Sequence, residues 1–222
     1  PVHGCRSGTF RNASEPAQAI PFDTLGSSFN NARPAEMSNR TVLYSFRRCP
    51  FAMRARWAVL QAGLLVDWRE IELKDKPAPM LELSPKATVP VLALADGTVI
   101  DESLAVMRWA LDQTDPLDLC RQGSVSAQNS ITRLIDLNDT TFKHHLDRFK
   151  YADRYAGESK AEHQMEGLSV LRHWSRLIEE LGGWLVDSSC SLADGALWPF
   201  VRQWRIADPD GFDADPTLEP LR

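Results

Sequence analysis

Cysteine is scarce in this sequence, and its wide spacing argues against two common uses of the residue. The four cysteines stand at positions 5, 49, 120 and 190 of 222, with no CxxC pair and no spacing typical of metal ligands. Disulfide scaffolds and structural zinc sites use closely spaced sets of cysteines, so neither is expected here, and we predict no metal site. Free thiols are typical of a reducing compartment, which favours a cytoplasmic protein.

The sequence also lacks an excess of positive charge and any long apolar run. Lys and Arg number 25 against 30 Asp and Glu, a formal net charge of −5. This leaves no basic field to attract the phosphates of nucleic acid. A membrane span needs about 18 apolar residues in succession, and Arg54, Arg56, Asp67 and Arg69 interrupt the most apolar region. We therefore expect neither nucleic acid nor a membrane as a partner.

Regular periodicity is missing from residues 1–40, which are rich in Ser, Asn, Pro, Ala and Gly. Such composition predicts a disordered extension that takes no part in the fold. Met37 stands four residues before the first strand-like run, which raises the hypothesis that translation naturally starts there. A transit peptide is the alternative, although the arginines of this segment are offset by acidic residues.

Residues 41–113 alternate between strand and helix patterns. A β-branched and aromatic run over 41–46 predicts a strand, and apolar residues at helical spacing predict a helix over 50–62. Further strands are predicted over 65–73, 89–94 and 98–100, with a short helix inside 74–84 and a last helix over 101–113. Asp96-Gly97 indicates a two-residue hairpin between the last two strands. The order βαβαββα predicts an α/β thioredoxin-like domain with a mixed four-stranded sheet.

The second half of the chain shows helical patterns only. Polar residues over 114–124 predict a linker, and residues 125–222 predict an all-helical C-terminal domain. Apolar residues at helical spacing predict one long helix containing 131–149 and another containing 168–181. A third helix follows Ser191, whose segment Ser191-Leu192-Ala193-Asp194 resembles a capping box with Asp in place of Glu.

Cys49 is the candidate for chemistry. It lies between a predicted strand and a predicted helix that begins at Pro50, where unpaired backbone N–H groups and the helix dipole favour a thiolate. Arg47, Arg48 and Arg54 are expected to add positive potential. Ala52 occupies the position that would usually hold a second cysteine, so a mixed disulfide formed at Cys49 needs an external thiol for its resolution.

Four blocks of sequence surround this pattern: Cys49-Pro50-Phe51-Ala52, Leu73-Lys74-Asp75-Lys76-Pro77, Val89-Pro90 and Glu102-Ser103. Together with the intervals between them, they resemble the omega class of glutathione transferases. The resemblance covers about residues 40–205 and is strongest in the first half. The helical segment 138–155 looks more like bacterial glutathione transferases of unassigned substrate.

The resemblance implies that glutathione is a co-substrate, that Cys49 forms a mixed disulfide with it, and that the chain is a homodimer. The implied glutathione-binding residues are Phe51, Leu73, Lys76, Val89, Pro90, Glu102 and Ser103. Val89, ahead of a cis Pro90, would pair its backbone with the cysteinyl moiety. Glu102 and Ser103 would bind the γ-glutamyl ammonium and carboxylate, and Lys76 the glycyl carboxylate. A solvated turn lysine and plain helix-cap residues are the alternative interpretations of these side chains.

Three functions stay open at this point. A glutathione-dependent thiol transferase or reductase fits Cys49, whereas a glutathione-conjugating transferase normally uses Ser or Tyr, for which Tyr44 is a weak substitute. A non-catalytic interaction protein on the same fold is the third. Relatives usually continue into further helical structure at the C-terminal end, so a truncated helical domain with an incomplete acceptor pocket is also an open interpretation.

Candidate residues outside these blocks carry less weight. The adjacent pair His144 and His145 points in different directions on a helix, which favours a solvated face over a metal site. Asp136, Asp139 and Trp198 could line an acceptor pocket, but a polar helix face and a core aromatic are the favoured interpretations.

Overall fold

The computed structural model describes residues 40–222. The predicted disordered extension, with Cys5 and Met37, therefore lies outside the described residues except for Arg40. Within the described residues, no helix combines the length and the apolar character that crossing a membrane requires.

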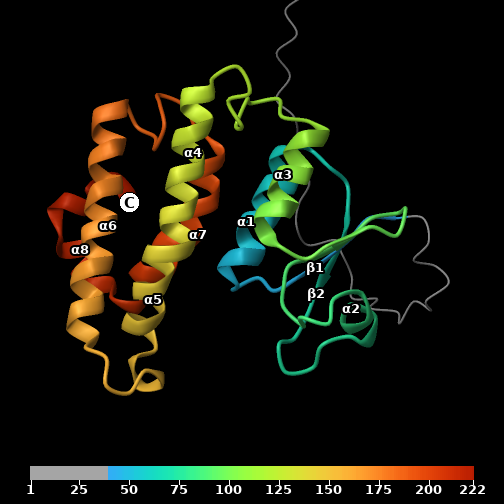
Figure 1. The fold of residues 1–222 in the computed structure, drawn as a ribbon, viewed down its shortest axis with the longest axis horizontal. Coiled ribbons are helices and arrows are strands. Elements are labelled where there is room, and N and C mark those ends of the chain that lie inside the picture. Colours follow the sequence, from blue (N-terminus) through green and yellow to red (C-terminus); the bar gives the residue numbers. More distant parts are fainter. Residues whose placement is uncertain (1–39) are drawn as a thin grey trace, which may run out of the picture. The chain divides into compact units, whose positions relative to one another are not determined.

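A four-stranded mixed sheet forms the N-terminal part (Figure 1). Its strands are β1 (Val42–Ser45), β2 (Asp67–Glu70), β3 (Val91–Ala93) and β4 (Val99–Ile100), in the order β2-β1-β3-β4. β1 pairs in parallel with β2 and antiparallel with β3, and β3 is antiparallel to β4. Between the strands stand α1 (Pro50–Gln61) and α2 (Ala78–Leu83), and α3 (Ser103–Gln113) follows β4. The predicted thioredoxin-like arrangement βαβαββα is confirmed.

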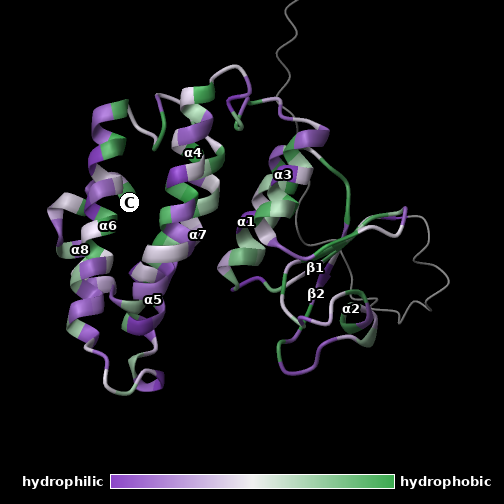
Figure 2. Ribbon diagram, viewed as in Figure 1, coloured by the Kyte–Doolittle hydropathy of each residue, from purple (hydrophilic) through white to green (hydrophobic). Residues whose placement is uncertain are grey.

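The two faces of the sheet have separate cores because successive side chains of a strand point in opposite directions. Leu43 and Leu92 belong to the larger core, which includes the buried faces of α1 and α3 and continues into the C-terminal helices. Tyr44 and Val91 belong to a smaller core with Met80 of α2. The apolar run of β1 is thus buried on both sides, and Figure 2 shows the hydrophobic residues gathered along it.

The C-terminal part is helical, as predicted. Its elements are α4 (Val125–Leu137), a π-helical segment (Asn138–Phe142), α5 (Lys143–Lys150), a 3₁₀ turn (Ala152–Arg154), α6 (Lys160–Leu181), α7 (Leu192–Ala207), α8 (Pro209–Ala214) and a second 3₁₀ segment (Pro216–Leu221). The long helices lie side by side (Figure 1), and α1 packs against both α3 and α7, which joins the helical part to the thioredoxin-like domain. The capping interaction predicted for α7 is present, since the Asp194 carboxylate accepts from the Ser191 N–H at 2.8 Å.

Two local predictions differ from the structure. The helix predicted over 131–149 does follow a helical path, but a π-helical segment separates α4 from α5. Such segments widen one turn by a residue and are frequent at functional sites. The predicted two-residue hairpin has three loop residues, because Leu94 N–H donates to Thr98 O at 2.8 Å across it. Gly97, at φ +88°, supplies the left-handed residue that a loop of this length needs.

Candidate functional site

Cys49 lies where the loop after β1 enters α1. It is the N-cap residue of α1 and is followed by Pro50 at the first helical position, where a missing N–H costs nothing. Its backbone carbonyl accepts the first helical hydrogen bond, from Met53 N at 2.9 Å. The side chain is half-buried beside the smaller core. The predicted placement of this thiol at a helix N-terminus is therefore correct.

The loop before β3 brings Val89 to this thiol. Cys49 Sγ donates a weak hydrogen bond to the Val89 carbonyl oxygen at 3.7 Å, and the Val89–Pro90 peptide bond is cis, as the resemblance implies. The ladder between β1 and β3 ends at Tyr44 and Val91. Among the described residues, neither the N–H nor the C=O of Val89 has a backbone partner. Buried backbone groups normally find partners, so this strand end is suited to an extended peptide.

Arg56, which the sequence analysis did not single out, holds the loop that carries Cys49. Its guanidinium reaches back from α1 and donates to the Ser45 hydroxyl, to Phe46 O at 3.2 Å and to Arg47 O at 2.9 Å. Burial lowers the pKa of Arg56, while the carboxylate of Glu70 and the nearby Cys49 oppose that shift. Arg56 thus fixes the backbone just before Cys49 and is one of the positive charges near it.

Arg54 has a different role from the one predicted. It was expected to add positive potential at Cys49. Its guanidinium is buried instead and donates two parallel hydrogen bonds to the Asp139 carboxylate, at 2.7 and 2.9 Å. Its Nε donates to Ser103 Oγ at 2.9 Å. The guanidinium also lies over two rings, 5.2 Å from the Phe51 centroid and 5.4 Å from that of Phe200. Arg54 therefore connects α1 to the start of α3 and to the π-helical segment.

The pair Glu102 and Ser103 stands at the N-terminus of α3, as predicted from the sequence. Ser103 is buried and accepts from Arg54, which leaves its own hydroxyl proton free to donate. Glu102 is exposed and accepts from Lys86 Nζ at 2.7 Å. Lys86 also bonds Asp101 at 3.1 Å, and these carboxylates raise its pKa. A cation thus already lies against Glu102, where the resemblance implies the ammonium of a ligand.

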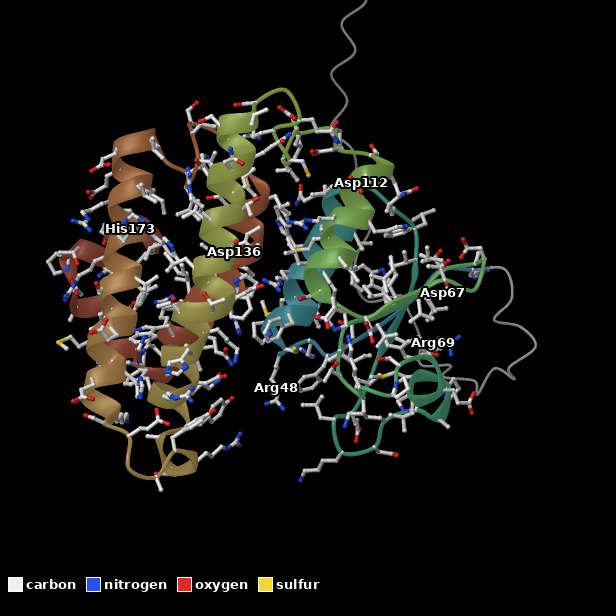
Figure 3. All side chains as sticks on the ribbon, in the orientation of Figure 1. Arg48, Asp67, Arg69, Asp112, Asp136 and His173 are labelled. Atoms are coloured by element: carbon white, nitrogen blue, oxygen red, sulfur yellow. The ribbon has the colours of Figure 1, made fainter. Side chains whose placement is uncertain are left out.

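The other implied glutathione-binding residues are less directly engaged. Lys76 folds back on its own turn and donates to Leu73 O at 2.9 Å, and the Leu73 side chain is exposed. The ring of Phe51 packs edge-on against Phe200 of α7, with centroids 5.1 Å apart, and so faces the helical part. Arg48 projects from the loop at the start of α1 (Figure 3), its guanidinium 5.3 Å from the Phe46 ring centroid.

The two other described cysteines have surroundings that favour the thiol. Burial and the neighbouring Asp115 carboxylate raise the pKa of Cys120 to about 12. Burial and Asp194 raise that of Cys190 to about 11. Both therefore stay protonated at neutral pH, which makes them poor nucleophiles.

A cavity of about 560 Å³ lies between α1, α6, α7 and the C-terminal end of the chain. Its walls include Trp57, Trp184 and Trp198, and Cys190 but not Cys49 is among them. Trp198 is largely exposed, so its interpretation as a core aromatic is wrong. Of the two acidic residues considered with it, Asp139 binds Arg54, whereas Asp136 is exposed on α4 (Figure 3).

Comparison with known proteins places the first part of the chain in a described family. Residues 43–118 match the family model "Glutathione S-transferase, N-terminal domain". Over 74 residues, the chain is 35% identical to the mouse protein named glutathione S-transferase omega-1. That match covers 33% of this chain and only 30% of the mouse protein's own length.

Solved structures extend the likeness to most of the chain. Glutathione transferase Omega 3C from Trametes versicolor matches with a TM-score of 0.69 at 19% identity, covering 84% of this chain and 80% of that one. A glutathione S-transferase-I bound with lactoylglutathione matches with a TM-score of 0.66 at 18% identity, covering 82% and 91%. At these identities, the likeness shows a shared fold that includes the helical part.

Proposed function

Since residues 43–118 match the N-terminal domain of glutathione S-transferases and most of the chain shares the glutathione transferase fold, we propose that the protein is an omega-like, glutathione-dependent thiol transferase. In this proposal Cys49 is the catalytic residue and forms a mixed disulfide with glutathione. The observation that carries the proposal is the Cys49 thiol at the N-terminus of α1, within 3.7 Å of the Val89 carbonyl oxygen.

The placement of Cys49 supports nucleophilic chemistry on a disulfide. The unpaired N–H groups of the first helical turn stabilise negative charge near the sulfur. Cys49 is only half-buried, so a disulfide can approach it. Cys120 and Cys190 stay protonated, which leaves Cys49 as the nucleophile among the three described thiols.

The proposed reaction has two exchange steps. The Cys49 thiolate attacks the glutathione sulfur of a mixed disulfide, so that a sulfur–sulfur bond to Cys49 forms as the substrate thiolate leaves. A second glutathione thiolate then attacks the glutathione sulfur bound to Cys49. Glutathione disulfide leaves, Cys49 is again a thiolate, and the proton of the second glutathione ends on the substrate thiol. The resolving thiol is external because Ala52 stands where a second cysteine would be.

The groups around Cys49 support a peptide ligand with charged ends. The backbone of Val89, which has no backbone partner among the described residues, would pair with the cysteinyl moiety ahead of Pro90. We assign the γ-glutamyl carboxylate to the hydroxyl and N–H of Ser103, and its ammonium to Glu102, where it would share the carboxylate with Lys86. We assign the glycyl carboxylate to the Lys76 ammonium, near Leu73. The neighbour bound with lactoylglutathione is consistent with a ligand of this type.

The structure offers little to the competing conjugation chemistry. That reaction needs a hydroxyl to support the glutathione thiolate, and the Tyr44 side chain is buried on β1 with no partner for its hydroxyl among the described residues. Tyr44 belongs to the smaller core beneath the sheet instead of the surface of the site. We also propose that the protein is a cytoplasmic homodimer, because this is typical of the superfamily.

The test is glutathione-dependent reduction of a small mixed disulfide by the wild type and by Cys49→Ser, with Cys120→Ser as the matched control. We expect Cys49→Ser to lose at least about 100-fold in turnover, since removal of a covalent nucleophile eliminates the route. Cys120→Ser should keep its activity. Mass spectrometry of the wild type after incubation with glutathione disulfide should find one glutathione on Cys49.

A conjugation assay with an electrophilic aromatic substrate distinguishes the alternatives. Conjugation that persists in Cys49→Ser, without disulfide reduction by the wild type, would overturn the proposal in favour of a conjugating transferase. Failure of the wild type in both assays, together with no measurable glutathione binding, would favour the non-catalytic interaction protein.

A further inference from the structure

Three histidines from two helices meet on the helical part of the chain, away from Cys49. His144 and His145 lie on α5, and His163 lies on the first turn of α6. One ligand atom of each lies within 4.8 Å of one ligand atom of both others. The sequence analysis predicted a solvated face for His144 and His145. It missed His163, which lies 18 residues after His145 and contacts the His145 ring.

The three rings converge closely. The ring centroids lie 5.0 Å apart for His144 and His145, 5.6 Å for His144 and His163, and 5.2 Å for His145 and His163. The two Nδ1 atoms of His145 and His163 face each other at 2.9 Å. Two nitrogens on a tetrahedral zinc ion lie about 3.3 Å apart, given Zn–N bonds of about 2.0 Å. A small separation of these two rings would admit an ion.

A carboxylate fixes the orientation of His163. Its Nε2 lies 2.9 Å from Glu158 Oε2, and Glu158 is held in turn by Arg148 Nε at 2.6 Å. Because a carboxylate only accepts, the proton of a neutral His163 sits on Nε2 and the lone pair sits on Nδ1, directed at His145. Histidines that bind metals commonly donate their other N–H to a carboxylate in this way.

We propose that His144, His145 and His163 form a binding site for a divalent transition metal ion of the zinc class. His163 and His145 would bind through Nδ1, and His144, which is exposed, would supply the third nitrogen. Three imidazoles leave a fourth tetrahedral position for water, and imidazole suits Zn²⁺, Ni²⁺ and Cu²⁺ better than Mg²⁺ or Ca²⁺. On binding, the proton on His145 Nδ1 moves to Nε2 or to solvent. This inference does not depend on the proposed function.

A bound ion would cross-link α5 and α6. α5 and α6 pack against each other, and Glu158 belongs to the segment that joins them. An ion bound to both helices would therefore close this hairpin and the connecting segment together. Because the ion binds only the folded arrangement, it stabilises the protein by mass action.

The experiment is competition for Zn²⁺ between the full chain and a chromophoric chelator, followed by thermal unfolding with and without ZnCl₂. We expect one Zn²⁺ per chain and a higher melting temperature with zinc. His163→Gln should weaken binding by at least about 100-fold, and Glu158→Gln by about 10-fold to 100-fold, the usual effect of losing a carboxylate that orients a ligand. His144→Gln, at an exposed position, tests the site if His163→Gln does not fold.

His173 provides the matched control, because it is an exposed histidine farther along α6 (Figure 3). His173→Gln should bind zinc as the wild type does. Absence of tight binding by the wild type would overturn the proposal. So would zinc binding that is equal in wild type, His144→Gln and His163→Gln but lost in Cys49→Ser, since that pattern would assign the ion to a thiolate.

Discussion

At the scale of single residues, the surroundings of each cysteine decide its reactivity. Burial and acidic neighbours raise the pKa of Cys120 to about 12 and that of Cys190 to about 11. A thiol is protonated below its pKa, and only the thiolate is alkylated rapidly. At pH 7.5, iodoacetamide should therefore spare Cys120 and Cys190, and among the described thiols it should modify the half-buried Cys49. Peptide mass spectrometry of a time course would measure this.

The pH dependence supplies the control for this prediction. In the native protein, labelling of Cys190 should rise only as the pH approaches about 11. Labelling of Cys120 should rise only as the pH approaches about 12. In denaturant, both should react at ordinary rates because burial is lost. Labelling of Cys120 at pH 7.5 as fast as that of Cys49 would contradict the assignment.

Sequence reasoning identified part of the candidate site and missed the rest for a physical reason. Cys49, Val89 and Pro90 are recognisable because local patterns, a strand followed by Cys-Pro and a Val-Pro pair before a strand, determine their positions. The burial of the Arg54 side chain does not follow from a local pattern. Arg54 is buried because Asp139, 85 residues later, faces it, and no spacing in the sequence reveals such a pair.

At the scale of the helices, one glycine sets how closely α6 and α7 approach. A Cβ on Gly167 would lie 2.2 Å from Cζ3 of Trp204. Trp204 is fully buried and stacked on Phe149 at 4.7 Å, so its ring has no room to withdraw. Gly167→Ala should therefore destabilise the protein by about 1–3 kcal/mol through overpacking, although Ala favours a helix by about 1 kcal/mol. Urea unfolding would measure the difference.

A double-variant cycle tests whether the ring is the cause. When Trp204→Leu is already present, Gly167→Ala should cost much less, because the smaller side chain leaves space for the methyl group. An equal cost in both backgrounds would mean that the ring does not limit the approach of the two helices.

The same scale shows what the sequence does and does not predict about the fold. The strand and helix order is recovered because hydrophobic periodicity and the stops at Gly and Pro are local signals. The π-helical segment Asn138–Phe142 is not, since its residues fit helical spacing equally well. It is there that Asp139 meets Arg54, so a tertiary contact accompanies the departure from regular helix.

At the scale of the whole described chain, Arg54 and Asp139 couple the helical part to the thioredoxin-like domain. The buried guanidinium donates two hydrogen bonds to the Asp139 carboxylate, whose charge compensates its own, and donates a third to Ser103 Oγ. Breaking one side of a buried ion pair leaves an uncompensated charge and typically costs about 3–5 kcal/mol, whereas replacing both partners by apolar residues is often neutral. Stability and ligand positioning can therefore be separated experimentally.

Asp139→Leu should destabilise the protein strongly, and Arg54→Met combined with Asp139→Leu should recover most of the loss, as urea unfolding would show. Glutathione affinity should behave differently. The double variant removes the Arg54 Nε that orients the Ser103 hydroxyl, so its affinity, measured by calorimetry, should stay about 10-fold weaker, equivalent to the roughly 1.4 kcal/mol of one hydrogen bond. Recovery of both stability and affinity in the double variant would show that Arg54 is structural only. Recovery of stability alone would mean that Arg54, which Asp139 holds in place, positions the group proposed to bind the ligand's carboxylate.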